Sequence, residues 1–257
     1  MLQTCTSMLT ILMCVITCSL GLYCCNPNEQ VTEIVEPAQK ATSAVIFLHG
    51  AGGSGPQIRE VVESNIGNFS QFPTTRLIFP TAKAVPLPGF PWNGQILNIW
   101  FSFTTLVENY SFNSDEMENS AKQIERLIEE QVAAGIPHRN ICLAGYSSGG
   151  MMSIYFGYGY VKKLGCIGAI SSYISSSSNV YNEISIQENN TCPRLPPLYL
   201  YGGALDFLTF PNWITGMANR LKDMGIQVTY LFQWTGTHYI NKDGLVNLFQ
   251  FIKESII

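Results

Sequence analysis

The chain has 257 residues, a net charge of −4 and only 12% charged side chains, roughly half the share of an average soluble protein. This length suits one large domain with a sizeable core, and a mildly acidic chain without a basic stripe argues against nucleic-acid binding. Its three histidines show no metal-ligand spacing and no Cys-x-x-Cys pattern occurs, so we expect neither a metal nor a cofactor.

The N-terminal segment is apolar and uncharged. No charged side chain occurs in residues 1–28, and residues 8–25 are almost entirely hydrophobic. A hydrophobic segment followed by small residues is typical of a secretory signal peptide, although the usual positive flank is absent. The same segment approaches the length of a membrane anchor. We therefore expect residues 1–25 to be a signal peptide or hydrophobic anchor, followed by a polar linker over residues 26–42.

Cysteines and glycosylation sequons bear on the cellular compartment. Five of the eight cysteines lie in the first 25 residues, whereas Cys142 and Cys166 fall in predicted strands, where we expect buried thiols rather than a disulfide framework. Asn-x-Ser/Thr sequons begin at Asn68, Asn109 and Asn189, all in predicted loops. With the apolar leader, they favour a glycosylated protein of the secretory pathway. A membrane-anchored or cytosolic protein is the alternative.

Short apolar runs alternate along the chain with segments of helical periodicity. Runs that are apolar on both faces are typical of central strands in a parallel sheet. They occupy residues 44–48, 76–79, 141–144, 166–170, 198–201 and 228–232. A stripe at steps of three and four predicts a helix from Asp115, capped by Asn113 or Ser114 and ended by Gly135. Further helices over 212–222 and 244–252 complete a parallel sheet covered on both faces.

The segment Gly-Tyr-Ser-Ser-Gly at 145–149 matches the pattern G-x-S-x-G between a predicted strand and a predicted helix. This is the setting of a nucleophile elbow, where glycines relieve the crowding of a tight turn and the serine projects above the sheet. The pattern alone is weak, and a serine in a glycine-rich loop is the alternative. The context favours Ser147 as a nucleophile at a helix N-terminus, where the dipole stabilises developing negative charge.

A nucleophilic serine needs a base, and the base needs an orienting carboxylate. His238 is the only histidine after Ser147, and it lies between the last predicted strand and the last predicted helix. Asp206 follows the carboxyl end of the strand at 198–201, where parallel sheets place their sites. An aspartate that caps the helix near residue 211 is the alternative role for Asp206. The other acidic candidates lie in a polar insertion, late in a helix or after the histidine: Glu183, Glu188, Asp223 and Asp243.

The negative charge that develops during acyl transfer needs two backbone N–H donors. We expect one from Ser148, directly after the nucleophile, and the other from Ala51 in the His-Gly-rich loop that follows the first predicted strand. Backbone donors require no particular side chain at either position. His49 is expected to pack this loop rather than to take part in catalysis.

These motifs resemble the acyl-protein thioesterase and lysophospholipase-like branch of the α/β-hydrolases. The resemblance rests on VIFLHGAGGSG, RLIFPTAKAVP, NGQILNIWFSF, IEEQVAAGIPHRNICLAGYSSGGMMS, LYLYGGALDFLT and GTHYINKDGLVNLFQFI. It implies an α/β-hydrolase domain over residues 43–257, with a mostly parallel central sheet and helices on both faces. It also implies Ser147, Asp206 and His238 as the catalytic triad, and Ala51 and Ser148 as the oxyanion donors.

Several positions depart from the pattern of that family. Ser148 stands where the family usually has Gln, Gly53 where it has Asp, and Ser102 where it has Asp after Trp-Phe. In the loop that leads to Asp206, the family usually has a polar residue after the glycine, whereas this chain has Ala204 and Leu205. No catalytic group is lost. The departures bear on substrate preference, because several lie where the acyl chain or the loop anchors are expected.

The resemblance implies a serine hydrolase that cleaves fatty-acyl thioesters on proteins, or related lipid or small esters, through an acyl-enzyme. A short-chain carboxylesterase and a catalytically silent acyl-binding protein are the alternatives. The segment over residues 84–103, rich in Pro, Trp and Phe, either lines an acyl groove or packs over the core. Contact with a membrane surface is a further expectation.

Overall fold

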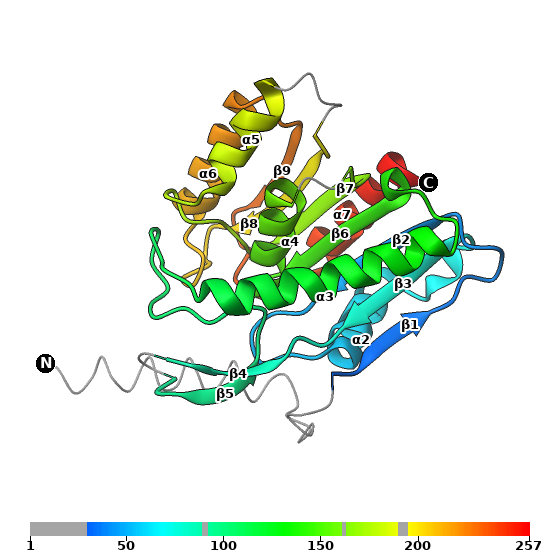
Figure 1. Cartoon of the computed structure of the whole chain (residues 1–257), viewed down its shortest axis with the longest axis horizontal. Coiled ribbons are helices and arrows are strands. Elements are labelled where there is room, and N and C mark those ends of the chain that lie inside the picture. Colours follow the sequence, from blue (N-terminus) through cyan, green and yellow to red (C-terminus); the bar gives the residue numbers. More distant parts are fainter. Residues whose placement is uncertain (1–29, 89–91, 161–162, 190–194) are drawn as a thin grey trace, which may run out of the picture.

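The computed structural model describes residues 30–88, 92–160, 163–189 and 195–257, and a seven-stranded sheet forms its centre (Figure 1). The strand order is β1-β3-β2-β6-β7-β8-β9. Six of these strands are parallel, which confirms the predicted, mostly parallel sheet. They are β2 (Ser43–Leu48), β3 (Thr75–Pro80), β6 (Ile141–Tyr146), β7 (Cys166–Ile170), β8 (Leu198–Gly203) and β9 (Val228–Gln233).

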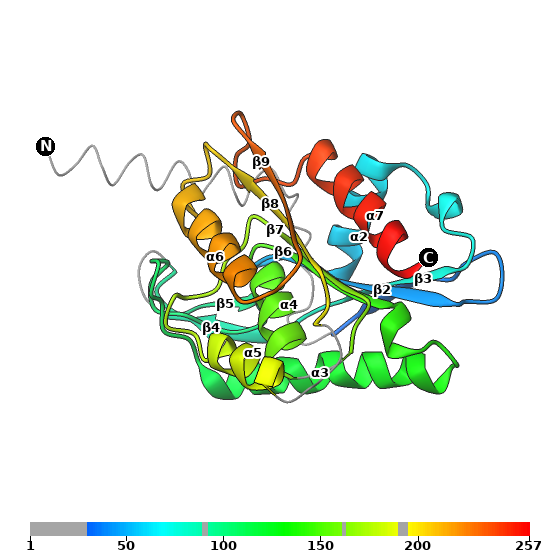
Figure 2. The ribbon, with the colours of Figure 1, turned by 90° about the horizontal axis from the view of Figure 1, so that it is seen from above.

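Helices cover both faces of the sheet (Figure 2). On one face lie α2 (Gly55–Ile66) and α7 (Lys242–Ile256). On the other lie α3 (Ser114–Ala133), α4 (Ser148–Gly159), α5 (Val180–Asn189) and α6 (Pro211–Asp223). Two short 3-10 turns, η1 (Phe69–Gln71) and η2 (His138–Asn140), precede β3 and β6.

Strand β2 shows why the central strands are continuous apolar runs in the sequence. Ala44, Ile46 and Leu48 enter the core on one face, and Val45 and Phe47 enter the core on the other. Side chains alternate between the faces of a strand, and here both faces are covered by helices. All five side chains are buried, so the alternation of polar and apolar residues that marks a half-exposed strand is missing.

Helix α3 begins and ends as predicted. The Asn113 side-chain oxygen accepts hydrogen bonds from the N–H groups of Asp115 (3.1 Å) and Glu116 (3.2 Å). Beyond its C-terminus, Gly135 adopts φ 95°, and its N–H bonds to the Val132 carbonyl at 2.9 Å. The left-handed conformation at this position explains the glycine that ends the helical pattern.

The predicted linker over residues 26–42 is wrong in part, because it contains an edge strand of the sheet. β1 (Thr32–Val35) pairs antiparallel with β3, and Val35 lies opposite Leu77. Beside it, Arg76 donates to the Glu36 carboxylate at 3.0 Å. The domain therefore includes residues from Thr32 onward rather than from 43. A four-residue edge strand with half-exposed side chains carries too little apolar signal to be recognised.

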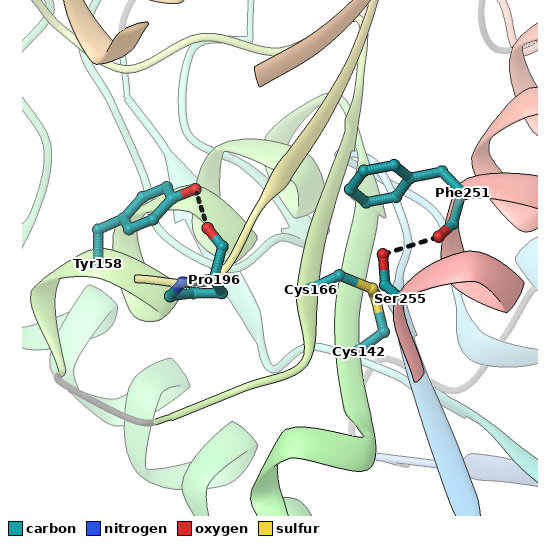
Figure 3. Close-up of a disulfide and its surroundings, with 6 residues drawn as sticks. All are labelled: Cys142, Tyr158, Cys166, Pro196, Phe251 and Ser255. Carbon is teal, nitrogen blue, oxygen red and sulfur yellow. Dashed lines mark hydrogen bonds between the residues drawn. A yellow bond between two sulfur atoms is a disulfide. The ribbon is translucent and has the colours of Figure 1, made fainter. Parts of the chain in front are cut away.

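The prediction of two buried thiols is also wrong, because Cys142 and Cys166 form a disulfide between β6 and β7 (Figure 3). The two residues face each other in the parallel register, with Cα atoms 4.7 Å apart, a separation that a disulfide spans. Only the strand pairing brings these positions together, so a spacing of 24 residues does not indicate a disulfide. Cys192 and the predicted leader lie outside the described residues.

An antiparallel hairpin stands apart from the main sheet (Figure 1) and consists of β4 (Ala84–Leu87) and β5 (Gln95–Asn98). Immediately after it, Ile99, Trp100 and Phe101 are buried in the core. The second part of the 84–103 segment therefore packs over the core, whereas Ile96 in the hairpin stays 62% exposed.

The segment around Glu183, expected to be a polar insertion, forms the helix α5. Asn189 is the last residue of this helix, so the loop predicted for its sequon is wrong.

Candidate active site

Three side chains from distant parts of the sequence meet at the edge of the sheet where the parallel strands end. Ser147 follows β6, Asp206 follows β8 and His238 follows β9. The His238 Nε2 atom lies 3.0 Å from Ser147 Oγ, and Nδ1 lies 2.9 Å from Asp206 Oδ2. The His238 side chain is 15% exposed, whereas that of Asp206 is fully buried. A hydroxyl, an imidazole and a buried carboxylate thus form one hydrogen-bonded chain, the arrangement that acyl-transfer triads use.

Ser147 occupies a strained turn between β6 and α4. Its φ of 52° and ψ of −123° are uncommon for a residue with a side chain. Its N–H donates to the Ile170 carbonyl (2.9 Å), and its own carbonyl accepts from the Met151 N–H (3.0 Å) and the Ser172 hydroxyl (2.9 Å). Such strain costs about 1–3 kcal/mol and persists only where the surroundings fix the backbone. The turn holds the hydroxyl of Ser147 at the end of β6.

Close packing explains the two glycines of the G-x-S-x-G pattern. A Cβ atom on Gly145 would lie 2.4 Å from the backbone carbon of Gly149. A Cβ atom on Gly149 would lie 2.5 Å from the carbonyl oxygens of both Leu48 and His49. These are clashes with backbone, which no side-chain rotation relieves. The glycines therefore let α4 begin directly against β2 and β6, as an elbow requires.

The Asp206 carboxylate is surrounded by hydrogen-bond donors. Its Oδ1 accepts from the N–H groups of Leu208 (2.9 Å) and Thr209 (2.8 Å), and its Oδ2 accepts from the Thr209 hydroxyl (2.5 Å). Burial by itself would raise the pKa of this carboxyl, but the interactions with His238 and Thr209 outweigh it and lower the pKa below its usual value. Asp206 is therefore ionised at neutral pH. The N-cap of α6 is Phe210, so the alternative of a helix-capping aspartate is wrong.

The loop after β2 brings the second expected oxyanion donor to the elbow. Gly50 packs so closely that a Cβ atom on it would lie 3.3 Å from Ser147 Cβ, and Ala51 follows in an exposed turn. Ser148 is the first residue of α4. Neither the Ala51 N–H nor the Ser148 N–H donates to any residue in the described part of the chain. The Ser148 side chain is buried, and its hydroxyl has no partner among those residues.

His49 is a buried support for this loop. Its Nδ1–H donates to the Gly50 carbonyl (2.6 Å), and its Nε2 accepts from the Ala82 N–H (3.0 Å). The Trp100 indole donates to the His49 carbonyl at 2.9 Å. Burial lowers the pKa of His49 to about 4, against the opposing effect of the Gly50 carbonyl. Both ring nitrogens of a neutral imidazole are thus occupied, which confirms the expected packing role.

Sequence reasoning missed three residues that support these groups. Thr209 holds the acid, Ser172 holds the carbonyl of the elbow, and the Tyr146 ring packs 5.4 Å from the His238 imidazole. A threonine three residues after an aspartate is a common turn pattern, and this pattern could have indicated Thr209. The other two are placed by strands that meet only in the fold.

Other features of the described residues lie apart from this site. No group of three or more His, Cys, Asp or Glu side chains among them could hold a metal ion. Within the same residues no helix is both long and apolar enough to span a bilayer. Two surface hollows, one beside Arg59 and Phe72 and the other beside Arg139 and Phe251, contain no triad residue.

The parallel sheet, the elbow and the hydrogen-bonded Ser-His-Asp arrangement define an α/β-hydrolase. The sequence matches the model of the Phospholipase/Carboxylesterase family over residues 29–256, and the chain belongs to this family. Its membership makes the protein a serine hydrolase and confirms the predicted family and fold.

Curated relatives and solved structures agree with this assignment. The chain is 26% identical to mouse lysophospholipase-like protein 1 over 215 residues, which cover 84% of this chain and 87% of the relative. It is 31% identical to Schizosaccharomyces pombe acyl-protein thioesterase 1 over 160 residues, covering 60% and 69% of the two chains. The structure of Zea mays acyl-protein thioesterase 2 superposes with a TM-score of 0.74 at 19% identity, covering 89% of this chain and 100% of that chain. Arabidopsis thaliana SOBER1 superposes with a TM-score of 0.70 at 20% identity, covering 84% and 99%.

Proposed function

We propose that this protein hydrolyses acyl thioesters or esters through Ser147, His238 and Asp206. The observation that carries the proposal is the continuous chain of hydrogen bonds from Ser147 Oγ through the imidazole to the buried carboxylate. The ionised carboxylate accepts from Nδ1–H, which leaves Nε2 as the proton acceptor that faces the hydroxyl.

The proposed reaction has two stages. Ser147 Oγ attacks the acyl carbon while His238 Nε2 takes the hydroxyl proton, and Asp206 stabilises the imidazolium that forms. The N–H groups of Ala51 and Ser148, which donate to no described residue, would receive the oxyanion. His238 then gives its proton to the leaving thiolate or alkoxide. In the second stage a water molecule attacks the acyl carbon while His238 Nε2 takes its proton, and His238 returns that proton to Ser147 Oγ as the acid leaves.

The substrate class follows from the relatives. Proteins similar to this chain are named acyl-protein thioesterase and lysophospholipase-like protein, so we propose fatty-acyl thioesters on proteins, or related lipid esters, as substrates. A short-chain carboxylesterase is the second candidate, since a rice relative that is 27% identical over 221 residues is named a probable carboxylesterase. The complete hydrogen-bonded triad opposes the third candidate, a silent acyl-binding protein.

Chain-length dependence of hydrolysis tests this proposal. We would compare kcat/KM for acetyl, octanoyl and palmitoyl thioesters and oxyesters of one small alcohol or thiol, with Ser147→Ala as the inactive control. A long-chain enzyme should gain up to about fourfold in kcat/KM for each methylene that it buries. A rate that falls with chain length would assign the carboxylesterase function. Tight fatty-acid binding without any turnover would refute hydrolysis altogether.

We also propose that the protein matures in the secretory pathway. The disulfide between Cys142 and Cys166 supports this, because disulfides form and persist in oxidising compartments. Asn68 and Asn109 are exposed, and in each the side-chain oxygen accepts a serine hydroxyl while the amide nitrogen donates to no described residue. Both amide nitrogens are therefore free to carry a glycan. The side chain of Asn189 lies outside the described residues.

Expression in a eukaryotic host tests this compartment. The mature protein should lose mass on treatment with peptide-N-glycosidase, and Asn68→Gln/Asn109→Gln should lose most of that change. Extraction at alkaline pH separates a secreted or luminal protein from an anchored one. Recovery of an unglycosylated protein with free Cys142 and Cys166 thiols from the cytosol would contradict the proposal.

A further inference from the structure

Exposed aromatic side chains gather around the proposed active site. Every large aromatic side chain that is well exposed in the described chain lies in the loop that carries Asp206 or in the loop that carries His238. Their exposed fractions reach 65% and 80%, and one leucine joins them. We call this set the aromatic rim, and it consists of Leu205, Phe207, Phe210, Trp234 and Tyr239.

The two loops form one fixed surface. The Ala204 N–H donates to the Gln233 carbonyl (2.9 Å), and the Leu205 N–H donates to the Gly236 carbonyl (2.8 Å). The Phe210 ring lies 4.7 Å from that of Trp213, which packs against the buried core. The rim is thus built on ordered backbone, and His238 from the same surface contacts Ser147.

The two loops that carry the aromatic rim contain almost no charged side chains. Residues 199–219 contain Asp206 as their only charged side chain, and it is buried. Residues 224–241 contain no Lys, Arg, Asp or Glu. Aromatic rings with an apolar body and a polar edge favour the interface between water and lipid, and exposed apolar patches mark docking sites. The lack of charge fits a zwitterionic lipid surface, whereas a charged partner would require complementary residues.

We propose that the aromatic rim docks the protein onto a zwitterionic lipid surface, with Ser147 turned toward that surface. The proposal rests on the proposed function, because the acyl chains of acylated proteins and lipids lie in such a surface. Docking would bring the acyl carbon to the serine without removing the substrate into bulk water. The lipid surface here is the partner, and the rim residues contact it rather than the reacting atoms.

Vesicle binding tests the proposal independently of catalysis. We would use Ser147→Ala protein with phosphatidylcholine vesicles that contain no substrate, and follow sedimentation and tryptophan fluorescence. Binding should occur with little dependence on salt and should shift the tryptophan emission to the blue, since Trp234 is 80% exposed in the free protein. Phe207→Ser/Trp234→Ser in the same background should bind about tenfold more weakly, because it removes two rings from the contact. Ile34→Ser/Ile186→Ser, which alters exposed side chains of β1 and α5, is the control and should bind as before.

Several results would overturn the proposal. They are a protein that does not bind these vesicles, a control that loses as much binding as the rim variant, and binding that disappears at high salt. A dimer that the rim variant abolishes, without any vesicle binding, would assign the rim to a second copy of the chain.

Activity on a soluble acetyl ester separates this proposal from the proposed function. The rim variant with Ser147 intact should keep that activity within about twofold, because Asp206 is held by Leu208, Thr209 and His238. A wild-type protein that binds vesicles but hydrolyses nothing would refute the function alone.

Discussion

At Asp206, burial and hydrogen bonding act on the carboxyl group in opposite directions. Burial raises its pKa, whereas His238 and the two donors of Thr209 stabilise the charged form and lower the pKa overall. One of these donors, the Thr209 hydroxyl, belongs to a side chain that can be changed without altering the backbone. Thr209 is thus a positioning residue, which acts on the reaction through the carboxylate.

Thr209→Val should lower kcat about tenfold and change KM little, since it removes one hydrogen bond to a charged group at nearly constant volume. With fewer donors the pKa of Asp206 rises, so the step of the kcat profile at which this carboxylate becomes protonated should move to higher pH. Thr209→Ser should restore both. Measuring kcat and KM across the pH range checks this, and an unchanged profile for Thr209→Val would contradict the role.

His49 should make the stability of the fold depend on pH. Its pKa of about 4 in the folded protein lies below the ordinary 6.5, so the unfolded chain binds more protons between these values. As far as His49 is concerned, the free energy of unfolding therefore has its full value above pH 6.5. It should fall by roughly 3 kcal/mol as the pH drops to 4. Urea titrations at several pH values should show a smaller fall in His49→Asn. Equal falls in the two proteins would contradict this.

The elbow depends on the close approach of helix α4 to strand β2. Gly149→Ala places a Cβ atom 2.5 Å from two carbonyl oxygens and should cost about 1–3 kcal/mol of stability, with a loss of activity as Ser147 is displaced. Gly216→Ala is the matched control, because a Cβ atom there meets nothing within 4 Å in α6. That change should stabilise the protein by about 0.5–1 kcal/mol. Urea unfolding and an ester assay compare the two, and wild-type behaviour of Gly149→Ala would contradict the account.

The elements that could be predicted are those buried on two faces or strongly amphipathic. β2 and β7 show continuous apolar runs, and α3 combines a clear stripe with a capping asparagine and a terminating glycine. Helix α2 was missed, although Ser54 caps it and a proline occupies its first turn. The edge strand β1 and the β4–β5 hairpin have mixed polarity, so their pairing partners rather than their own residues determine them.

The site was predictable to the extent that chain order defines it. Ser147, Asp206 and His238 follow three parallel strands, so a pattern along the sequence becomes proximity at one edge of the sheet. Contacts that arise between strands, such as the Ser172 hydroxyl on the Ser147 carbonyl, leave no comparable pattern. Two of the positions that depart from the family pattern have different surroundings. Ser148 is buried beside the elbow, and Leu205 is exposed in the aromatic rim.

For the whole molecule, the disulfide joins the strand that carries the nucleophile to its neighbour. Cys142 and Cys166 are 24 residues apart, and both are fully buried in the centre of the sheet. A cross-link that closes a loop of this length stabilises a fold by about 3 kcal/mol, chiefly by restricting the unfolded chain. The bond lies in the core, away from Ser147, so it should affect stability more than catalysis.

Urea unfolding with and without a reductant tests the contribution of the disulfide. The wild-type protein should lose about 3 kcal/mol of unfolding free energy when the unfolded chain is reduced. Cys142→Ala/Cys166→Ala should show no effect of the reductant and should keep its activity toward soluble esters. Two free thiols in the unreduced wild-type protein, detected by mass spectrometry, would contradict the cross-link.

The proposed reaction requires that Ser147 is a nucleophile and that His238 activates it. Labelling of the purified protein with a fluorophosphonate probe, followed by peptide mapping, tests it most directly. We expect one adduct, on Ser147, with no labelling of Ser147→Ala and greatly slowed labelling of His238→Ala. Wild-type protein that does not react, or an adduct that persists in Ser147→Ala, would contradict it.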